Sequence, residues 1–265
     1  MKLRLATLIA FVFVAACSDP ESANTAVQAA SPTASTTTTD TSNQATAAAS
    51  VAPAADATPE RIELAQADTA GADLESAGYV EGQHYVLISP AQPTSATGAG
   101  QVEVAEFFMY SCIHCYNFEP YVEEWLGGKA DYVNFVRVPT VWNEAVRMHA
   151  QAFYAAAALG KGEEMHTPFF REMHVANNYL TSPNDMEDFF ARFDVSSDDF
   201  QSSFESFSVN TSLRQADELA RRYRIDSTPT VVVNGKYRTN ASMAGGYPEL
   251  LALIDALAAA EYEAM

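Results

Sequence analysis

Two cysteines separated by two residues, Cys112 and Cys115, are the pair in this 265-residue sequence best placed to do chemistry. Thiols at this spacing can close into a disulfide and reopen, which transfers two electrons, or they can bind a metal ion. A β-branched and aromatic stretch over 102–108 predicts a strand before them, and apolar periodicity from Tyr116 to Leu126 predicts a helix directly after Cys115. Unpaired N–H groups at a helix start favour a thiolate, so the pattern predicts a reactive dithiol.

The surrounding residues argue against other uses of a Cys-x-x-Cys pair. A structural zinc site needs a second pair of cysteines or histidines at ligand spacing. The other histidines, which do not form such a pair, are His84, His149, His166 and His174. Haem attachment requires a histidine directly after the second cysteine, where Tyr116 stands. A structural disulfide that closes so small a loop adds little stability. We therefore expect a thioredoxin-like redox motif, with no cofactor and no metal.

A proline later in the chain supports this prediction. Pro229 follows Thr228 and stands directly before 230–233, a β-branched stretch that is typical of a strand. By itself this predicts no more than a proline that opens a strand. In the thioredoxin superfamily, which the pattern resembles, a cis-proline at such a place lies against the dithiol. The residue before it offers backbone groups to an extended substrate peptide. The resemblance therefore implies that the Thr228-Pro229 bond is cis and that both residues bind substrate.

Two segments carry a closer resemblance. The first runs from Glu106-Phe107-Phe108 through Cys112-Ile113-His114-Cys115-Tyr116 to Phe118-Glu119, and the second runs from Thr228-Pro229 to Val233-Asn234-Gly235-Lys236-Tyr237. Both resemble the periplasmic DsbA-type thiol:disulfide interchange proteins, and the likeness extends from about Tyr79 to the C-terminus. It implies an α/β fold of the thioredoxin type with an inserted helical subdomain.

The resemblance also implies roles for individual residues. Cys112 would be the exposed nucleophile, Cys115 its shielded partner, and His114 a group that stabilises the Cys112 thiolate. Strand alternation places Glu106 on the same face as the apolar residues two positions away on either side. The resemblance makes Glu106 the acid that exchanges protons with Cys115. From the pattern alone, a glutamate at a surface edge remains the alternative.

The sequence departs from the family pattern at Ile113, where proline is usual. Proline at this position fixes the backbone and removes an N–H near the sulfur. Ile113 restores that N–H, which could stabilise the thiolate, and loosens the turn, which could do the opposite. The sequence leaves the sign of the effect open.

The remaining patterns predict the elements around the dithiol. Strands are expected at 85–88, 102–108, 132–138, 230–233 and 236–239, the last two joined by a hairpin turn at Asn234-Gly235. Helical patterns predict an insertion at about 141–224, with helices at 144–159, 182–193, 198–207 and 211–223, and a last helix at 248–260. A strand, a helix and a strand in succession are typical of a βαβ unit. Together with the DsbA resemblance, these elements predict one thioredoxin-like domain over 78–265.

The N-terminal part of the chain predicts export rather than folding. Residues 1–17 combine two basic residues, a short apolar run and small residues before Cys17, as in a lipoprotein-type signal peptide; an ordinary signal peptide is the alternative. Residues 18–77 are rich in Ala, Ser and Thr and cannot bury enough apolar surface to fold, so they predict a disordered tether. The net charge, −19 for the chain and about −13 for 78–265, argues against a nucleic-acid partner.

These observations predict a disulfide donor, anchored in the periplasm by a lipid on Cys17, that acts as a monomer on exported proteins with free cysteines. By resemblance, a quinone-linked membrane oxidase would reoxidise it. A disulfide reductase or isomerase on the same fold is the nearest alternative, although the tether offers no dimerisation module for an isomerase. A non-catalytic periplasmic binding lipoprotein is the alternative from another class.

Overall fold

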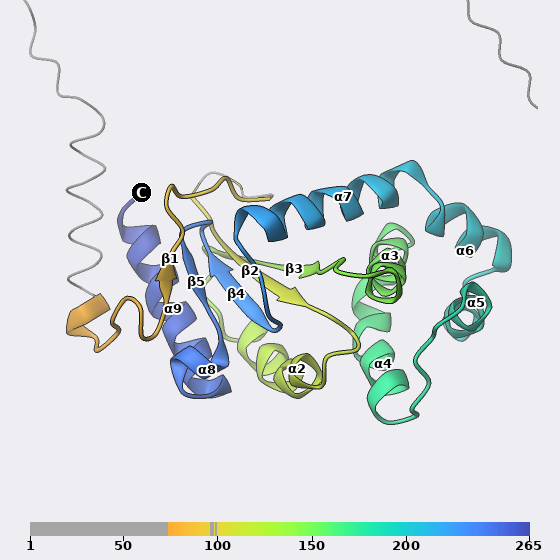
Figure 1. The fold of residues 1–265 in the computed structure, drawn as a ribbon, viewed down its shortest axis with the longest axis horizontal. Coiled ribbons are helices and arrows are strands. Elements are labelled where there is room, and N and C mark those ends of the chain that lie inside the picture. Colours follow the sequence, from red (N-terminus) through yellow and green to blue (C-terminus); the bar gives the residue numbers. More distant parts are fainter. Residues whose placement is uncertain (1–73, 96–97, 99) are drawn as a thin grey trace, which may run out of the picture. The chain divides into compact units, whose positions relative to one another are not determined.

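A mixed sheet forms the centre of the domain (Figure 1). The structure, a computed structural model, describes residues 74–95, 98 and 100–265, so the expected signal segment with Cys17 and nearly all of the expected tether lie outside the described residues. In the described part, five strands have the order β1-β5-β4-β2-β3. They are β1 (Val86–Leu87), β2 (Val102–Phe108), β3 (Val133–Pro139), β4 (Thr230–Val233) and β5 (Tyr237–Thr239). β2 and β3 are parallel, whereas β4 is antiparallel to both β2 and β5.

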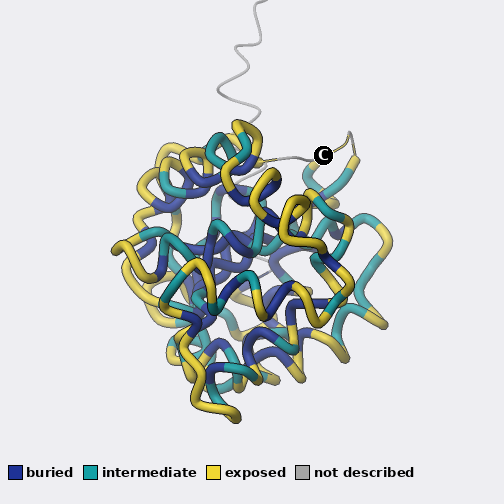
Figure 2. Tube along the Cα trace, turned by 90° about the vertical axis from the view of Figure 1, so that its right-hand side faces the viewer, coloured by how far each residue is buried: buried dark blue, intermediate teal, exposed yellow. Residues whose placement is uncertain are grey.

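Helices cover both faces of this sheet, which is why every residue of β2 is buried. The helices that pack on it are α2 (Ile113–Leu126), α7 (Phe207–Arg222) and α9 (Tyr247–Glu263). Val104 of β2 packs in the cluster with α2 and α9, whereas its neighbour Ala105 packs against α7. Figure 2 shows the strands as the buried interior and the outer turns of the helices as exposed. Alternation along β2 therefore points Glu106 to the α2 side.

Between β3 and β4 the chain forms the expected helical block. Its helices are α3 (Glu144–Ala158), α4 (Gly162–His174), α5 (Pro183–Ala191) and α6 (Ser197–Phe204), followed by α7. Their aromatic and Met side chains form one buried cluster with Phe108 of β2. Two predicted helix starts are confirmed: Asn143 accepts the N–H of Val146, and Ser182 forms a capping box with Asp185.

Periodicity in the sequence did not predict α4. Gly162 opens this helix and Pro168 lies inside it, and a proline in a helix interior costs roughly 3 kcal/mol. The helix forms because Met165, Phe170 and Met173 are almost completely buried against the rest of the block. Each such side chain contributes roughly 1.5–3 kcal/mol on burial, so packing outweighs the poor helix propensity.

The boundary between α6 and α7 also differs from the prediction. The helix expected to continue to Phe207 ends at Phe204, and the next helix begins at Phe207 rather than at Thr211. Ser206 is the reason, because its hydroxyl accepts the backbone N–H of Val209 and caps α7.

The predicted hairpin turn is confirmed. Asn234 and Gly235 have φ angles of 49° and 64°, as a type I′ turn requires, and they join β4 to β5. A short helix, α8 (Ala241–Ala244), then leads into α9.

At the N-terminal end of the domain, Leu74 is already buried, in the cluster that includes residues of β2, α2 and α9. The sequence placed Leu74 in the tether because the average composition of 18–77 conceals a single apolar residue that packs in the core. The fold therefore begins before the expected position.

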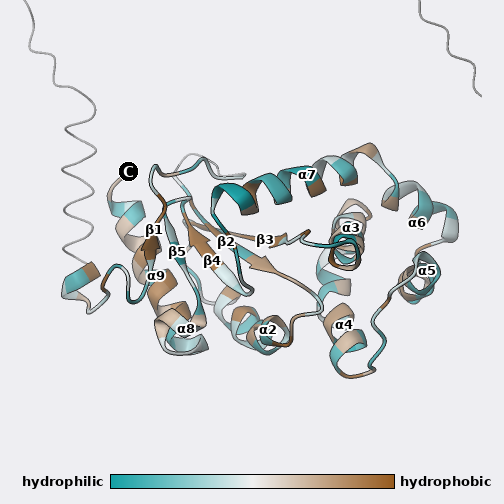
Figure 3. Cartoon of the chain, viewed as in Figure 1, coloured by the Kyte–Doolittle hydropathy of each residue, from teal (hydrophilic) through white to brown (hydrophobic). Residues whose placement is uncertain are grey.

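Apolar residues are concentrated in the strands, while α7 is polar over much of its surface (Figure 3). Among the described residues 74–95, 98 and 100–265, no helix is both long and apolar enough to span a bilayer.

Candidate active site

The dithiol lies where β2 ends and α2 begins. The helix starts at Ile113, between the cysteines rather than after Cys115 as predicted, so Cys112 is its N-cap residue. The reason is that the N–H of Tyr116 already bonds to the carbonyl of Cys112, at 3.1 Å, and closes the first turn over the motif. Both thiols are free; Cys112 is partly exposed and Cys115 is buried. The fold thus presents one sulfur to a partner and shields the other.

The two thiols ionise very differently. The pKa of Cys112 falls to about 5, mainly because the Cys115 thiol donates a hydrogen bond to its sulfur. The side chain of Thr228 and the backbone N–H groups of Cys115 and His114 lower the pKa further, whereas burial raises it. Those N–H groups face the sulfur without making a full capping hydrogen bond. Burial raises the pKa of Cys115 well above its usual range, and the hydrogen bond that its thiol donates to Cys112 raises it further. At neutral pH the pair is one thiolate and one thiol.

The loop before β4 lies against Cys112. The Thr228-Pro229 peptide bond is cis, as the resemblance to the thioredoxin superfamily implied. The Sγ of Cys112 lies 3.3 Å from the carbonyl oxygen of Thr228, to which the thiol form donates. The fold therefore brings the reactive sulfur beside the backbone of this loop, although the two are 116 positions apart.

Glu106 is 1% exposed and lies on the α2 side of β2. Its Oε2 makes no hydrogen bond, and the Nε of Arg137 is 3.9 Å away. Burial, and then the charge of Glu119, raise the pKa of Glu106 to about 8, against a lowering by Arg137. This burial excludes the surface-edge position that the sequence left open. A buried acid with such a pKa can give or take a proton near neutral pH.

Sequence reasoning missed a buried charged cluster next to Glu106. Arg137 of β3 lies 3.0 Å from Glu119 of α2, and Glu119 lies 2.8 Å from His166 of α4. His166 in turn lies 2.9 Å from the hydroxyl of Tyr110. The sequence signal for this cluster was Arg137 in the middle of an apolar strand, because an arginine is rarely buried without a carboxylate partner.

Comparison with known proteins agrees with this geometry. Residues 133–258 match the family model described as a DSBA-like thioredoxin domain. The thiol:disulfide interchange protein DsbA of Burkholderia cepacia is 37% identical over 186 residues, which are 70% of this chain and 87% of that protein. The chain belongs to the DsbA family. The DsbA of Pseudomonas aeruginosa is 36% identical over 194 residues, which are 73% of this chain and 91% of that protein.

Solved DsbA structures share the fold. The crystal structure of Pseudomonas aeruginosa DsbA matches with a TM-score of 0.65 at 35% identity, covering 71% of this chain and 96% of that chain. The oxidoreductase DsbA from Xylella fastidiosa gives 0.65 at 31% identity, covering 69% of this chain and 97% of that chain. The α/β thioredoxin fold with a helical insertion, expected from the DsbA resemblance, is therefore confirmed.

Ile113, at the position where the DsbA family usually has proline, is 48% exposed and is the first residue of α2. The N–H groups that lower the pKa of Cys112 belong to His114 and Cys115 rather than to Ile113. The difference from proline therefore lies in the freedom of the turn. Tyr247 limits that freedom, because its hydroxyl donates to the carbonyl of His114 at 3.0 Å. His114 is exposed and acts here through its backbone; the role of its imidazole stays a prediction.

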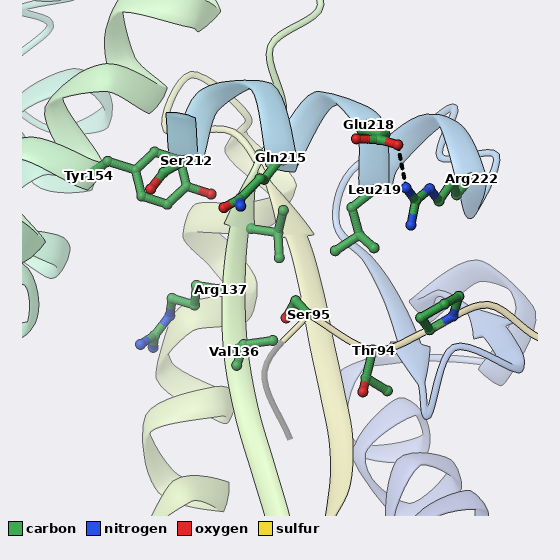
Figure 4. Close-up of a pocket in the computed structure, with 13 residues that line it drawn as sticks. Thr94, Ser95, Val136, Arg137, Tyr154, Ser212, Gln215, Glu218, Leu219 and Arg222 are labelled. Atoms are coloured by element: carbon green, nitrogen blue, oxygen red, sulfur yellow. Dashed lines mark hydrogen bonds and ion pairs between the residues drawn. The ribbon is translucent and has the colours of Figure 1, made fainter. Parts of the chain in front are cut away.

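A cavity of about 460 Å³ lies on the α7 face of the sheet (Figure 4). Val136 of β3, Leu219 and Gln215 of α7, and Tyr154 of α3 are among the residues that line it. In Figure 4 the side chain of Arg137 points away from these residues. Since the dithiol helix of this DsbA-family protein packs on the opposite face, the cavity is not part of the dithiol site.

Proposed function

We propose that this protein donates disulfides to exported proteins, with Cys112 as the sulfur that substrate thiolates attack. In the oxidised enzyme a substrate thiolate bonds to Cys112, the bond to Cys115 breaks, and Cys115 leaves as a thiolate that takes up a proton. A second substrate thiolate then attacks the substrate sulfur of the mixed disulfide, and Cys112 leaves. The substrate loses two electrons and two protons; the enzyme keeps both electrons and one proton, and the other proton goes to solvent.

One observation carries this proposal: the pKa of Cys112 is about 5, next to a buried Cys115 whose pKa is raised. A thiolate stabilised in this way is a good leaving group, and it favours the reduced enzyme over the disulfide. The oxidised enzyme therefore passes its disulfide on readily. A reductase needs the opposite balance, so the donor is preferred over a reductase or isomerase. Thr228 and Pro229 hold the substrate peptide against Cys112 through their backbone.

Equilibration of the purified protein with glutathione buffers tests the donor function. Thiol alkylation followed by a gel shift measures the reduced fraction at each ratio of reduced to oxidised glutathione. We expect the protein to stay reduced in buffers that oxidise thioredoxin. A potential as negative as that of thioredoxin, about −270 mV, would contradict the proposal.

Glu106→Gln should slow proton transfer to Cys115. Because its pKa is raised to about 8, Glu106 holds a proton near neutral pH and can supply it to the departing Cys115 thiolate. The amide cannot, and we expect oxidation of a two-cysteine peptide at pH 7, followed by stopped flow, to slow roughly 100-fold or more. Glu103→Gln is the matched control, because Glu103 is equally buried on the same strand but hydrogen-bonds to Ser95. Equal rates for the two variants would argue against proton transfer by Glu106.

A lipid on Cys17 is proposed to hold the protein to a membrane in the periplasm. The support is the basic, apolar and small-residue order of residues 1–17. In bacterial cells, Cys17→Ser should no longer incorporate labelled palmitate and should move from the membrane fraction to a soluble fraction, while Ser22→Ala should stay membrane-bound. Palmitate labelling of the Cys17→Ser variant would disprove the anchor.

On this proposal, the partners are exported proteins with free cysteines and a quinone-linked membrane oxidase that restores the disulfide between Cys112 and Cys115. Reoxidation by membranes should stop when quinone is extracted.

The protein acts as a monomer, because one domain carries the whole site. Sedimentation at micromolar concentration should give the mass of one chain.

A further inference from the structure

Two buried acids next to the dithiol compete for one cation. The side chain of Arg137 is 6% exposed and reaches both Glu119 and Glu106. Its guanidinium donates to both carboxylate oxygens of Glu119, at 3.0 and 3.3 Å, but its Nε stays 3.9 Å from Glu106, beyond hydrogen-bond distance. A forked pairing of this kind compensates one buried carboxylate. Whatever holds Arg137 on Glu119 therefore sets the charge next to the dithiol.

His166 is the second partner of Glu119. Its Nε2 lies 2.8 Å from Oε1 of Glu119, and the two side chains are 3% and 5% exposed. Because a carboxylate can only accept hydrogen bonds, the ring carries a proton on Nε2 and donates it. The hydroxyl of Tyr110 holds the ring at Nδ1, and the rings of Phe108 and Phe170 contact it edge-on. The donor of His166 is thus held in one direction, toward Glu119.

We propose that His166 is a positioning residue that decides which of the two buried acids Arg137 neutralises. By donating to Glu119, His166 keeps that carboxylate ionised and paired with Arg137, so Glu106 receives no hydrogen bond from Arg137. Glu106 then stays protonated and can supply Cys115, so this inference rests on the proposed function of Glu106. It connects a residue of the helical insertion to the proton balance of the dithiol.

The directions of the pKa changes agree with this arrangement. Burial alone would raise the pKa of Glu119, but the hydrogen bond from His166, its charge, and then Arg137 bring it below the usual range. After burial, the ionised Glu119 is the largest cause of the raised pKa of Glu106. The charge of Glu119 is therefore the link between His166 and Glu106.

Other titratable groups near the cluster are less able to control it. Glu163 of α4 lies 3.6 Å from Arg137 and Glu123 of α2 lies 4.0 Å from it, but their side chains are 90% and 55% exposed. Water screens the charges of both side chains. A cavity of about 490 Å³, lined by Arg137, Glu163 and His166, lies at this edge of the sheet. From the dithiol, the Cys112 thiolate also raises the pKa of Glu106, as the smallest of its causes.

The pKa of Glu106 in the reduced mature chain tests the proposal. Carbon-13 NMR of the glutamate carboxyl groups measures it, and loss of one signal in Glu106→Gln assigns it. His166→Leu should lower the pKa of Glu106 from about 8 to about 7 or below, because Glu119 then loses its charge more readily and Arg137 turns to Glu106. His166→Gln, whose amide can donate to Glu119, should keep the pKa near 8.

His149→Leu is the matched control. His149 is also a buried histidine, but its Nε2 binds the carbonyl of Tyr179, so the pKa of Glu106 should not change. An unchanged pKa of Glu106 in His166→Leu, or an equal fall in both variants, would overturn the proposal.

If His166→Leu does not fold, a second pair of variants tests the proposal. Glu119→Gln must lower the pKa of Glu106, and the double variant Glu119→Gln with His166→Asn must lower it no further. Peptide oxidation by Glu106→Gln tests the proposed function separately, because that rate does not depend on what sets the pKa.

Discussion

Cys112→Ser should abolish disulfide donation, with a fall of more than about 10³-fold in the rate at which the protein oxidises a two-cysteine peptide. The Cys112 sulfur is both the atom that the substrate attacks and the group that leaves last, and a serine forms no disulfide. Cys115 is 0% exposed and cannot take its place at the surface. The rate is measured by separating oxidised from reduced peptide at timed intervals after acid quenching.

Cys115→Ser should fail in a different way. Its partly exposed Cys112 thiolate can still attack a disulfide of a partner protein, which bonds one partner sulfur to Cys112 and releases the other as a thiolate. No Cys115 thiol is present to displace the bound partner, so mixed disulfides should accumulate. Non-reducing electrophoresis of cell extracts should show adducts that disappear with reductant, whereas Cys112→Ser should show none. Adducts on Cys112→Ser, or residual donation by it, would contradict the assignment of the two sulfurs.

The reduced protein should be more stable than the oxidised protein at pH 7, by about 2 kcal/mol in free energy of unfolding. The pKa of Cys112 is about 5 in the fold, against 9.0 for an ordinary thiol, so at pH 7 the folded chain holds a thiolate that the unfolded chain lacks. Two pH units between pH 7 and the folded pKa correspond to about 2.7 kcal/mol. The value expected is smaller because Cys112 is partly exposed and water screens its charge.

The stability difference should depend on pH with a definite sign. Because the folded pKa of Cys112 is depressed, the thiolate stabilises the reduced fold fully above about pH 9, and this stabilisation is lost as the pH falls toward about 5. Urea unfolding of both forms across this range measures it. Reduced Cys112→Ser, which has no thiolate at this position, should show no such dependence. A stability gap that widens on acidification would contradict the origin assigned to it.

Local patterns predicted the elements that carry the dithiol. The stretch 102–108 is β2 residue for residue, and the start of α3 at Glu144 and the turn at Asn234 stand where expected. Caps, turns and buried strands depend on a few adjacent residues, which a sequence displays. The helix α4 was missed because Pro168 contradicts it locally; burial against the rest of the insertion forms it. That contribution comes from residues distant in the chain.

The same division holds for the site. The sequence by itself determined its reactive chemistry: Cys112 and Cys115 at a strand-to-helix junction, with Thr228-Pro229 before a later strand, need only residue types and their order. Only the tertiary structure decided how those groups ionise. The pKa of Cys112 depends on what touches its sulfur, and the pKa of Glu106 depends on a cluster with members on α2, β3 and α4. The free energy of a buried charge is set by distance and burial, which no local pattern contains.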